Sequence, residues 1–322
     1  MSQKSIAVLT SGGDAPGMNA AVRAVVRTGI NKGMKVYGVH RGYSGLISGD
    51  VFEMNLRSVS DIIGNGGTAL YTARSEEYKT PEGTKKAADT CKKLGISGVV
   101  VIGGDGSFHG AKRIMNHGIT CVGVPGTIDN DIACSEYTVG FDTAMNTAIQ
   151  MVDRIRDTAQ SHDRCSIVEV MGRHCGDLAL QTGIATGATA ILIPEVEYNI
   201  ERDVIDRIIN TQKTGKKHFI VVVAEGVGGV QDLAKYIENR LGIEARATVL
   251  GHVQRGGSPT LRDRVVASEM GYRAVQVLEQ EKGNRVVAMR DGKIIDLPYE
   301  EALSMERVFD ENLYKVAMSI SI

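Results

Sequence analysis

The sequence of 322 residues, with 43% hydrophobic and 23% charged residues, has a globular composition and exceeds the usual size of one compact domain, so we expect two α/β lobes. A formal net charge of −1 excludes the positive field that favours nucleic acid or an anionic membrane. Five widely spaced cysteines without a CxxC pair argue against a disulfide framework or zinc site and fit a reducing cytoplasm. The start, Met1 to Leu9, lacks a basic region followed by a long apolar stretch, so we expect neither export nor membrane embedding.

Short β-branched runs alternate with helical patterns along the chain. The apolar residues between Thr143 and Arg156 recur at helical spacing, which predicts an amphipathic helix packed against a sheet. Together these patterns predict mostly parallel sheets with crossover helices. The runs expected to form buried strands are Ile6–Leu9, Lys35–Val39, Val99–Ile102, Thr120–Val124, Ser166–Val170, Ala190–Ile193 and Phe219–Val223.

Two predicted strands run into glycine-rich turns that are followed by a helical pattern. Strand 6–9 leads into Ser11-Gly12-Gly13-Asp14, and strand 99–102 leads into Gly103-Gly104-Asp105-Gly106-Ser107. One such turn is explained by a tight strand–helix connection, but two favour phosphate binding, because open α/β sheets bind ligands at the carboxyl ends of their strands and helix N-termini attract anions. Asp105 suits magnesium, which takes one or two carboxylates with phosphate oxygens and waters, but it equally suits a helix N-cap.

A third turn follows the predicted strand 120–124. It reads Pro125-Gly126-Thr127-Ile128-Asp129-Asn130-Asp131 and places two carboxylates two residues apart beside a hydroxyl. Asp-rich turns are usually Asx turns, and that interpretation stays open for Asn130. A carboxylate at this sheet edge can also accept the proton of an attacking hydroxyl during phosphoryl transfer.

These turns and two later segments together resemble the signature segments of the bacterial ATP-dependent 6-phosphofructokinase family. An isolated Gly-Gly-Asp-Gly is also similar to diacylglycerol and NAD kinases, whereas the full set, in order over nearly the whole chain, is far more specific. The matching segments are Leu9–Ala21, Gly103–Ser107, Pro125–Asp131, Met171–Arg173 and Gly251–Pro259.

The resemblance implies a glycolytic enzyme that transfers a phosphoryl group from MgATP to the 1-hydroxyl of fructose 6-phosphate, giving fructose 1,6-bisphosphate and ADP. It implies that Asp129 is the catalytic base, that Asp105 contacts the magnesium, and that Thr127 and Arg173 orient and stabilise the transferring group. A solvated loop residue is the alternative for Arg173. The residues matching the nucleotide site are Gly13, Arg74, Gly103, Gly104, Asp105, Gly106 and Ser107.

The resemblance also implies a sugar-phosphate site and a homotetramer. Family counterparts of Arg164 and Arg246 reach across from a neighbouring subunit, although either arginine alone also fits an ordinary surface position. Glu225 follows a predicted strand, where it would accept hydrogen bonds from sugar hydroxyls or be merely solvated. The matching substrate residues are Thr127, Asp129, Arg164, Met171, Gly172, Arg173, Glu225, Arg246, His252 and Arg255.

Two alternatives come from the same family pattern. In pyrophosphate-dependent relatives the position of Gly106 resembles Asp and that of Gly126 resembles Lys; both are glycine here, which favours ATP. A catalytically silent regulatory subunit should have lost Asp129 or Asp105, and both are present.

The family's second site binds ADP or phosphoenolpyruvate, and this sequence matches it incompletely. Leu56 stands where the family has an Arg, and Thr214 stands where it has a Lys. Thr189 stands where the family has a Glu that helps to hold the effector's magnesium. Arg57 and Lys213 lie next to Leu56 and Thr214 in the sequence. We expect weakened effector binding. The matching residues are Arg23, Arg27, Asp61, Arg156, Gly187 and Lys216.

By the same resemblance, the nucleotide lobe comprises residues 1–139 plus 253–303, and the sugar-phosphate and effector lobe comprises residues 140–252 plus 304–322.

Overall fold

The computed structural model describes residues 3–321, so Met1, Ser2 and Ile322, which belong to the predicted lobes, lie outside the described residues. The chain divides into two compact units. The first unit comprises Met1–Ile128, Ile132–Thr143 and Arg255–Arg307, and the second comprises Asp129–Asp131, Ala144–Gln254 and Val308–Ile322. One unit boundary falls within helix α5, Phe141–Ser161.

The first unit is built on a seven-stranded sheet in the order β11-β10-β5-β4-β1-β2-β3. Strands β10, β5, β4, β1 and β2 are parallel to their neighbours in that row, whereas β11 and β3 pair antiparallel at the two edges. The strands are β1 (Ser5–Ser11), β2 (Lys35–Val39), β3 (Val51–Met54), β4 (Ile96–Gly103), β5 (Thr120–Pro125), β10 (Arg285–Arg290) and β11 (Lys293–Pro298).

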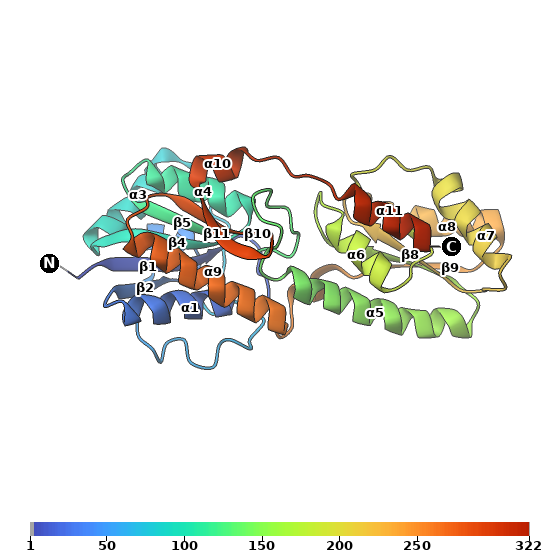
Figure 1. The fold of residues 1–322 in the computed structure, drawn as a ribbon, viewed down its shortest axis with the longest axis horizontal. Helices are drawn as coiled ribbons and strands as arrows, with labels where there is room; N and C mark the ends of the chain where they lie inside the picture. The colour runs from blue at the N-terminus through green and yellow to red at the C-terminus, as the bar shows by residue number, and fades with distance from the viewer. Residues whose placement is uncertain (1–2, 322) are drawn as a thin grey trace. The chain divides into compact units, whose positions relative to one another are not determined.

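Helices cover both faces of this sheet. Helices α1 and α9 pack together on one face, and α3, α4 and α10 lie on the other (Figure 1). The second face buries Leu9, Val101 and Phe108 in one apolar cluster. The helical segments are α1 (Met18–Asn31), α2 (Tyr43–Ser48), the 3₁₀ turn η1 (Glu77–Lys79), α3 (Pro81–Lys93), α4 (Asp105–Met115), α9 (Leu261–Glu279) and α10 (Tyr299–Ser304).

The second unit has a smaller, wholly parallel sheet in the order β7-β8-β6-β9. Its core includes Ile167, Val221 and Ile237, all fully buried. The strands are β6 (Cys165–Val170), β7 (Ala190–Leu192), β8 (Phe219–Ala224) and β9 (Ala245–Val249). The helical segments are α6 (Asp177–Ala185), the π-helical turn η2 (Glu201–Ile205), α7 (Asp206–Gln212), α8 (Val230–Leu241), the 3₁₀ segment η3 (Gly251–Arg255) and α11 (Glu311–Ile320).

The predicted fold class is therefore confirmed: two mostly parallel sheets flanked by helices. All seven predicted strands are found, five of them within a residue of their expected bounds, whereas β1 ends two residues later and β4 begins three residues earlier than predicted. The helix predicted from Thr143 to Arg156 is the middle of α5. Strands β3, β9, β10 and β11 were not predicted. Among residues 3–321, no helix combines the length and the apolar content that crossing a membrane requires. All five cysteines are buried free thiols.

Candidate active site

The three predicted turns lie side by side at one edge of the first unit's sheet. In the parallel register, Ser11 at the end of β1 pairs with Gly103 at the end of β4, and Gly103 pairs with Pro125 at the end of β5. The carboxyl ends of three adjacent strands therefore deliver the Gly12-Gly13 turn, the Gly103–Ser107 turn and the start of the Pro125–Asp131 segment to one place. This is where open α/β sheets bind ligands.

Glycine is required at this edge because the backbone segments approach one another closely. A Cβ on Gly103 would lie 2.5 Å from both the Ser11 carbonyl oxygen and Ser107 Oγ, and Gly12 has a φ of +88°. A Cβ on Gly13 would lie 2.9 Å from Arg255 Nη1. The predicted substrate residue Arg255 thus brings its guanidinium against the first glycine turn, where Nη1 also donates to the Asp14 carbonyl at 3.4 Å. Exposed backbone N–H groups and a nearby guanidinium form an arrangement suited to phosphate oxygens.

Asp105 is the first residue of α4 rather than its N-cap. Gly104 occupies the N-cap position, and no side-chain hydrogen bond caps this helix. The N-cap interpretation of Asp105 was therefore wrong. The carboxylate is half-exposed and lies 3.5 Å from His109 Nε2. In residues 3–321 no group of three or more His, Cys, Asp or Glu side chains is placed to hold a metal ion.

Thr127 is buried and close to the second glycine turn. A Cβ on Gly104 would lie 3.6 Å from Thr127 Cβ, and the Gly126 N–H donates to the Gly103 carbonyl at 3.0 Å. The Thr127 carbonyl accepts a 2.6 Å hydrogen bond from Thr138 Oγ1. Residues 126–127 are thereby attached both to the neighbouring strand end and to the segment that follows them.

Asp263 on α9 fixes that following segment, and its role was missed from the sequence. Its carboxylate is fully buried and accepts hydrogen bonds from Tyr137 Oη at 2.5 Å, Gly140 N at 2.7 Å, Thr143 N at 2.8 Å and Thr143 Oγ1 at 2.5 Å. Burial raises the pKa of Asp263, while these hydrogen bonds act in the opposite direction. An aspartate in a helical pattern gives no sequence signal for such a role, because its donors lie about 120 residues earlier in the chain.

The acidic residues of the third turn are grouped with the second unit. Asp129 is buried, with 7% of its surface exposed. Asn130 has a φ of +51° and donates from Nδ2 to Asp177 Oδ2 at 2.9 Å, at the first residue of α6. Asp131 Oδ2 lies 3.8 Å from Arg173 Nη1. The predicted phosphoryl-stabilising arginine therefore contacts, through Asp131, the short segment that carries the predicted base Asp129. The contribution of Asp177 was not predicted.

Arg173 is held in a left-handed conformation with its side chain mostly exposed. Its φ is +57°, its N–H donates to Glu225 Oε1, and a Cβ on Gly226 would lie 2.6 Å from its carbonyl oxygen. Glu225 is thus a half-buried hydrogen-bond acceptor, not a merely solvated strand end. The pKa of Glu169, which the sequence did not single out, is raised by burial and by the negative charge of Glu225. Strained backbone of this kind concentrates at functional sites.

Two further substrate positions lie on either side of a buried glutamine. The Met171 N–H donates to Gln254 Oε1 at 3.3 Å, and Gln254 Nε2 donates to the Gly251 carbonyl at 3.1 Å. This ties the predicted segment 171–173 to η3, which carries His252 with its side chain exposed. Gln254 is fully buried and positions the segment rather than contacting solvent.

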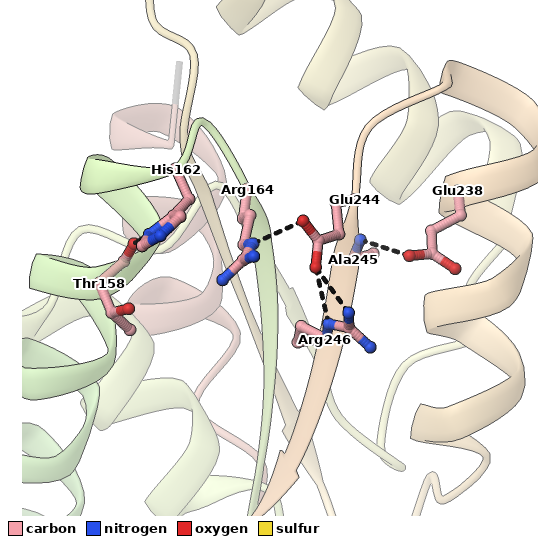
Figure 2. A network of polar contacts seen from close by, with 7 residues as sticks. All are labelled: Thr158, His162, Arg164, Glu238, Glu244, Ala245 and Arg246. Carbon is pink, nitrogen blue, oxygen red and sulfur yellow. Dashed lines mark hydrogen bonds and ion pairs between the residues drawn. The ribbon is translucent and has the colours of Figure 1, made fainter.

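Glu244 joins the two arginines that were predicted to act across subunits. Arg164 Nε lies 2.7 Å from Glu244 Oε2, and Arg246 Nη2 and Nε lie 2.6 Å and 2.9 Å from Oε1 (Figure 2). Hydrogen bonds from both arginines, Arg164 first, lower the pKa of Glu244. Figure 2 shows both guanidinium groups turned toward the same carboxylate between β6 and β9. A concentrated positive charge that one carboxylate only partly balances suits an anionic ligand.

The predicted effector residues fall into two groups. In the second unit, Arg156 Nη2 donates to the Thr186 carbonyl, next to Gly187, and the pKa of Lys216 is lowered by burial and by the positive charge of Arg156. In the first unit, Arg23 and Arg27 are one helical turn apart on α1, and Asp61 is exposed with a φ of +60°. Arg74 of the nucleotide set is exposed on the segment between β3 and α3.

Comparison with known proteins identifies the family. The family model described as Phosphofructokinase matches residues 5–278. The chain belongs to the phosphofructokinase family. This confirms the family predicted from the five segments and, with it, the predicted phosphotransferase class.

Other members of the phosphofructokinase family match nearly the whole chain. An ATP-dependent 6-phosphofructokinase from Clostridium botulinum is 58% identical over 318 residues, covering 99% of both chains. The structure of phosphofructokinase from Saccharomyces cerevisiae is 36% identical with a TM-score of 0.89, covering 99% of this chain and 47% of the yeast chain. A pyrophosphate-dependent phosphofructokinase from Marinobacter aquaeolei is 23% identical with a TM-score of 0.84, covering 96% of this chain and 86% of the other, and shares the fold.

Proposed function

We propose that the chain is an ATP-dependent 6-phosphofructokinase that transfers the γ-phosphate of MgATP to the 1-hydroxyl of fructose 6-phosphate, in the cytoplasm, as a step of glycolysis. The observation that carries this proposal is the parallel register that brings Ser11, Gly103 and Pro125 into one row of strand ends. That row presents two glycine turns, each before a helix N-terminus, together with the segment that carries Thr127 and Asp129. Phosphoryl transfer depends mainly on positioning and electrostatic stabilisation, which this row can supply.

In this proposal the first unit binds the nucleotide. Gly13, Arg74 and the Gly103–Ser107 turn hold the phosphates through backbone N–H groups and a guanidinium. Asp105 would hold the Mg²⁺, which would supply positive charge to offset the negative charge of the phosphates. Residues 1–139 plus 253–303 form the nucleotide lobe, and residues 140–252 plus 304–322 form the lobe for the sugar phosphate and effectors.

Asp129 acts as the general base for the 1-hydroxyl of the sugar. Its buried position removes the carboxylate from bulk water, which strengthens its interaction with a substrate proton. Thr127 and Arg173 orient the transferring phosphoryl group and stabilise its charge. The 6-phosphate and the sugar hydroxyls are bound by Arg164, Met171, Gly172, Glu225, Arg246, His252 and Arg255.

The donor is ATP rather than pyrophosphate. A Cβ on Gly106 would meet no atom within 4 Å, so the structure leaves space beside the second glycine turn. At Gly126, in contrast, a Cβ would lie 3.1 Å from both Met18 Cε and Ile102 Cγ2. A Lys there would require small shifts of Met18 and Ile102, so the packing disfavours the residue type that pyrophosphate-dependent relatives have at this position.

A coupled assay tests the proposed function. The purified chain is supplied with MgATP and fructose 6-phosphate, and ADP release is followed; the assay is then repeated with pyrophosphate as the donor and without Mg²⁺. We expect turnover with ATP, little with pyrophosphate, and loss of turnover without Mg²⁺. Turnover with pyrophosphate at a rate equal to or above that with ATP would overturn the donor assignment, and no turnover with either would overturn the function.

We further propose that the active form is a homotetramer in which Arg164 and Arg246 serve the site of a neighbouring subunit. Mixing inactive Asp129→Asn and Arg246→Ala variants should then restore activity through hybrid sites. Sedimentation that shows a fully active monomer at assay concentration would exclude this arrangement.

Allosteric control by ADP and phosphoenolpyruvate should be weak. Thr214 has no charge and donates its hydroxyl to the Thr211 carbonyl at 2.7 Å, while the adjacent Lys213 donates from Nζ to Asn210 Oδ1 at 2.9 Å. Titrating each effector to millimolar levels should change the half-saturation for fructose 6-phosphate by no more than about 5-fold. A strongly sigmoidal curve with phosphoenolpyruvate that ADP restores to hyperbolic would contradict this.

A further inference from the structure

Two separate segments of the second unit carry the proposed base and the proposed phosphoryl-stabilising arginine. Asp129 begins the segment 129–131, and Arg173 lies in the turn 171–177 that leads into α6. A proton acceptor and a positive charge act together on one transferring group only when their separation is fixed, because phosphoryl transfer depends mainly on positioning. The contacts that join these two segments are therefore candidates for a role in the reaction.

The side chain of Asn130 joins segment 129–131 to the first turn of α6. Its Nδ2 donates to Asp177 Oδ2 at 2.9 Å, and only 7% of the surface of Asn130 is exposed. Its φ of +51° lies in the left-handed region, which asparagine tolerates better than most residues. The Asn130 carbonyl also accepts a weak hydrogen bond from Cys175 Sγ at 3.9 Å. The residue next to the base is thus held through both its side chain and its backbone.

The turn between Arg173 and Asp177 is closed and tightly packed. The Cys175 N–H donates to the Gly172 carbonyl at 2.8 Å, and a Cβ on Gly172 would lie 2.4 Å from the Cys175 carbonyl oxygen. Gly172 has a φ of +134°, a conformation that side chains rarely adopt. Because the turn is short and closed, holding Asp177 in place also holds the backbone of Arg173.

Helix capping does not account for the contact of Asp177 with Asn130. Gly176 is the N-cap of α6, and no side-chain hydrogen bond caps this helix. The Gly176 N–H donates instead to Glu195 Oε1 at 2.8 Å. A carboxylate in the first turn interacts favourably with the helix dipole, but that interaction needs only the charge and no partner at hydrogen-bond distance. The helix terminus therefore leaves the bond to Asn130 unexplained.

The same two segments meet a second time at Arg173. Asp131 Oδ2 lies 3.8 Å from Arg173 Nη1, and the arginine side chain is mostly exposed. Exposed ion pairs are screened by water and contribute little. The Asn130–Asp177 bond is part-buried and has an ionised acceptor, which makes it the stronger of the two connections.

We propose that Asp177 is a positioning residue for phosphoryl transfer, which acts through Asn130 to fix the base Asp129 relative to Arg173. The inference rests on the proposed function, since it assigns the support of the base named there. Asp177 contacts no substrate in this role; it sets the separation of the proton acceptor and the positive charge. Its loss should lower kcat more than substrate affinity, because misplaced reacting groups stabilise the transition state less while substrate contacts remain.

Steady-state kinetics of Asp177 variants provide the first test. Asp177→Ala should lower kcat by about 10-fold or more, with the half-saturation concentrations for ATP and fructose 6-phosphate within about 2-fold of wild type. Asp177→Asn removes the charge but keeps an oxygen acceptor of the same shape, so its kcat should stay within about 3-fold of wild type.

The matched control is Asp232→Ala, which removes an exposed carboxylate from the first turn of α8 and should keep wild-type kinetics. A wild-type kcat in Asp177→Ala would overturn the proposal. Equal losses of kcat in Asp177→Asn and Asp177→Ala would also overturn it, because they would show that the charge matters and the hydrogen bond does not.

Asn130→Gly tests the same contact from the other side. Glycine adopts the left-handed conformation without strain, so this variant removes the donor and keeps the backbone. It should lower kcat by the same factor as Asp177→Ala, and the double variant should be no more than about 2-fold slower than either single variant, since both remove one bond. Independent, additive losses in the double variant would contradict the proposal. Asn130→Gly also serves as the test where Asp177→Ala folds poorly.

A cycle with Asp129 distinguishes positioning of the base from general damage to the fold. In an Asp129→Asn background, Asp177→Ala should change kcat by less than about 3-fold, because the base that it positions is already absent. A loss in that background as large as in the wild type would show a merely structural role and overturn the proposal.

Hydrogen exchange without substrates gives a readout that does not depend on turnover. A peptide containing residues 129–131 should exchange faster in Asp177→Ala than in the wild type, and at the wild-type rate in Asp177→Asn. Unchanged exchange in Asp177→Ala would overturn the positioning role alone. Absence of all kinase activity in the wild type would instead overturn the proposed function.

Discussion

Replacing Asp263 with Asn is the sharpest test of how the Thr127 segment is held. The change keeps the shape of the side chain but replaces one carboxylate oxygen with an NH₂ group. Each carboxylate oxygen accepts one backbone N–H and one hydroxyl: Gly140 N with Tyr137 Oη, and Thr143 N with Thr143 Oγ1. The hydroxyls can rotate to accept from the new NH₂ group, but a backbone N–H cannot.

The expected loss of stability follows from that count. At least one buried N–H loses its acceptor, at about 1–3 kcal/mol, and the remaining bonds lose the strength given by an ionised acceptor. Relief of a buried charge offsets part of this, so we expect Asp263→Asn to lower the free energy of unfolding by about 2–4 kcal/mol. Asp232→Asn on α8, whose side chain is 90% exposed, should change it by less than about 0.5 kcal/mol.

Urea unfolding of both variants at pH 7.5 measures the loss, and hydrogen exchange locates it. Peptides that contain residues 137–143 and 126–129 should exchange faster in Asp263→Asn, while those of the second sheet should not. Burial raises the pKa of Asp263 in the folded chain above its value in the unfolded chain. The contribution of Asp263 to the free energy of unfolding is therefore largest below the unfolded-state pKa, and it falls as the pH rises through the folded-state pKa. The wild-type advantage over the variant should therefore be greater at acid pH. Equal stability of Asp263→Asn and Asp232→Asn would refute the reasoning.

Three further substitutions test the proposed chemistry. Asp129→Asn should lower kcat by roughly 10²-fold or more with little change in either half-saturation, and unchanged turnover would remove it as the base. Gly106→Asp should fold normally, since a Cβ there meets no atom within 4 Å, yet lose about 10-fold or more in kcat/KM for ATP through charge repulsion; unaltered ATP saturation would contradict the donor argument. Glu244→Gln should weaken the contacts that hold Arg164 and Arg246 to this side chain. The half-saturation concentration for fructose 6-phosphate should then fall by about 2- to 5-fold at neutral pH. A rise in that concentration would show instead that Glu244 orients the arginines.

Local sequence patterns predicted the parallel strands β1, β2 and β4 to β8, which are largely buried, but missed the parallel strands β9 and β10. Strand β8 and residues 99–102 of β4 read as apolar runs, and every residue in them is buried. The antiparallel edge strands β3 and β11 are only partly buried, and their mixed composition gives no such run. Their strand conformation depends on pairing with a neighbour that the local sequence does not reveal.

The turns of the candidate site were predictable because their residue types carry the requirement. A Cβ on Gly103 would clash with both Ser11 and Ser107, so only glycine fits at this position. Such a requirement for glycine can be inferred from the sequence. Asp263 and Asn19 were not predictable. Each is a polar residue in a helical pattern, where a solvent-exposed position is the ordinary expectation, and each is buried because distant backbone groups converge on it.

The effector positions illustrate how substitutions redistribute a site's contacts. Thr189 is buried at the edge of β7 and binds the second sheet through its N–H, which donates to the Ile220 carbonyl at 2.7 Å. A threonine there cannot supply the metal-binding charge that the family's Glu provides. Arg156 and Lys216 remain close enough for their like charges to lower the pKa of Lys216, and a bound phosphate would relieve that repulsion. Thr189 thus lacks the metal-binding carboxylate of the family pattern, and Leu56 and Thr214 lack two of its cations, so we expect weaker contacts to both the magnesium and the phosphate of an effector.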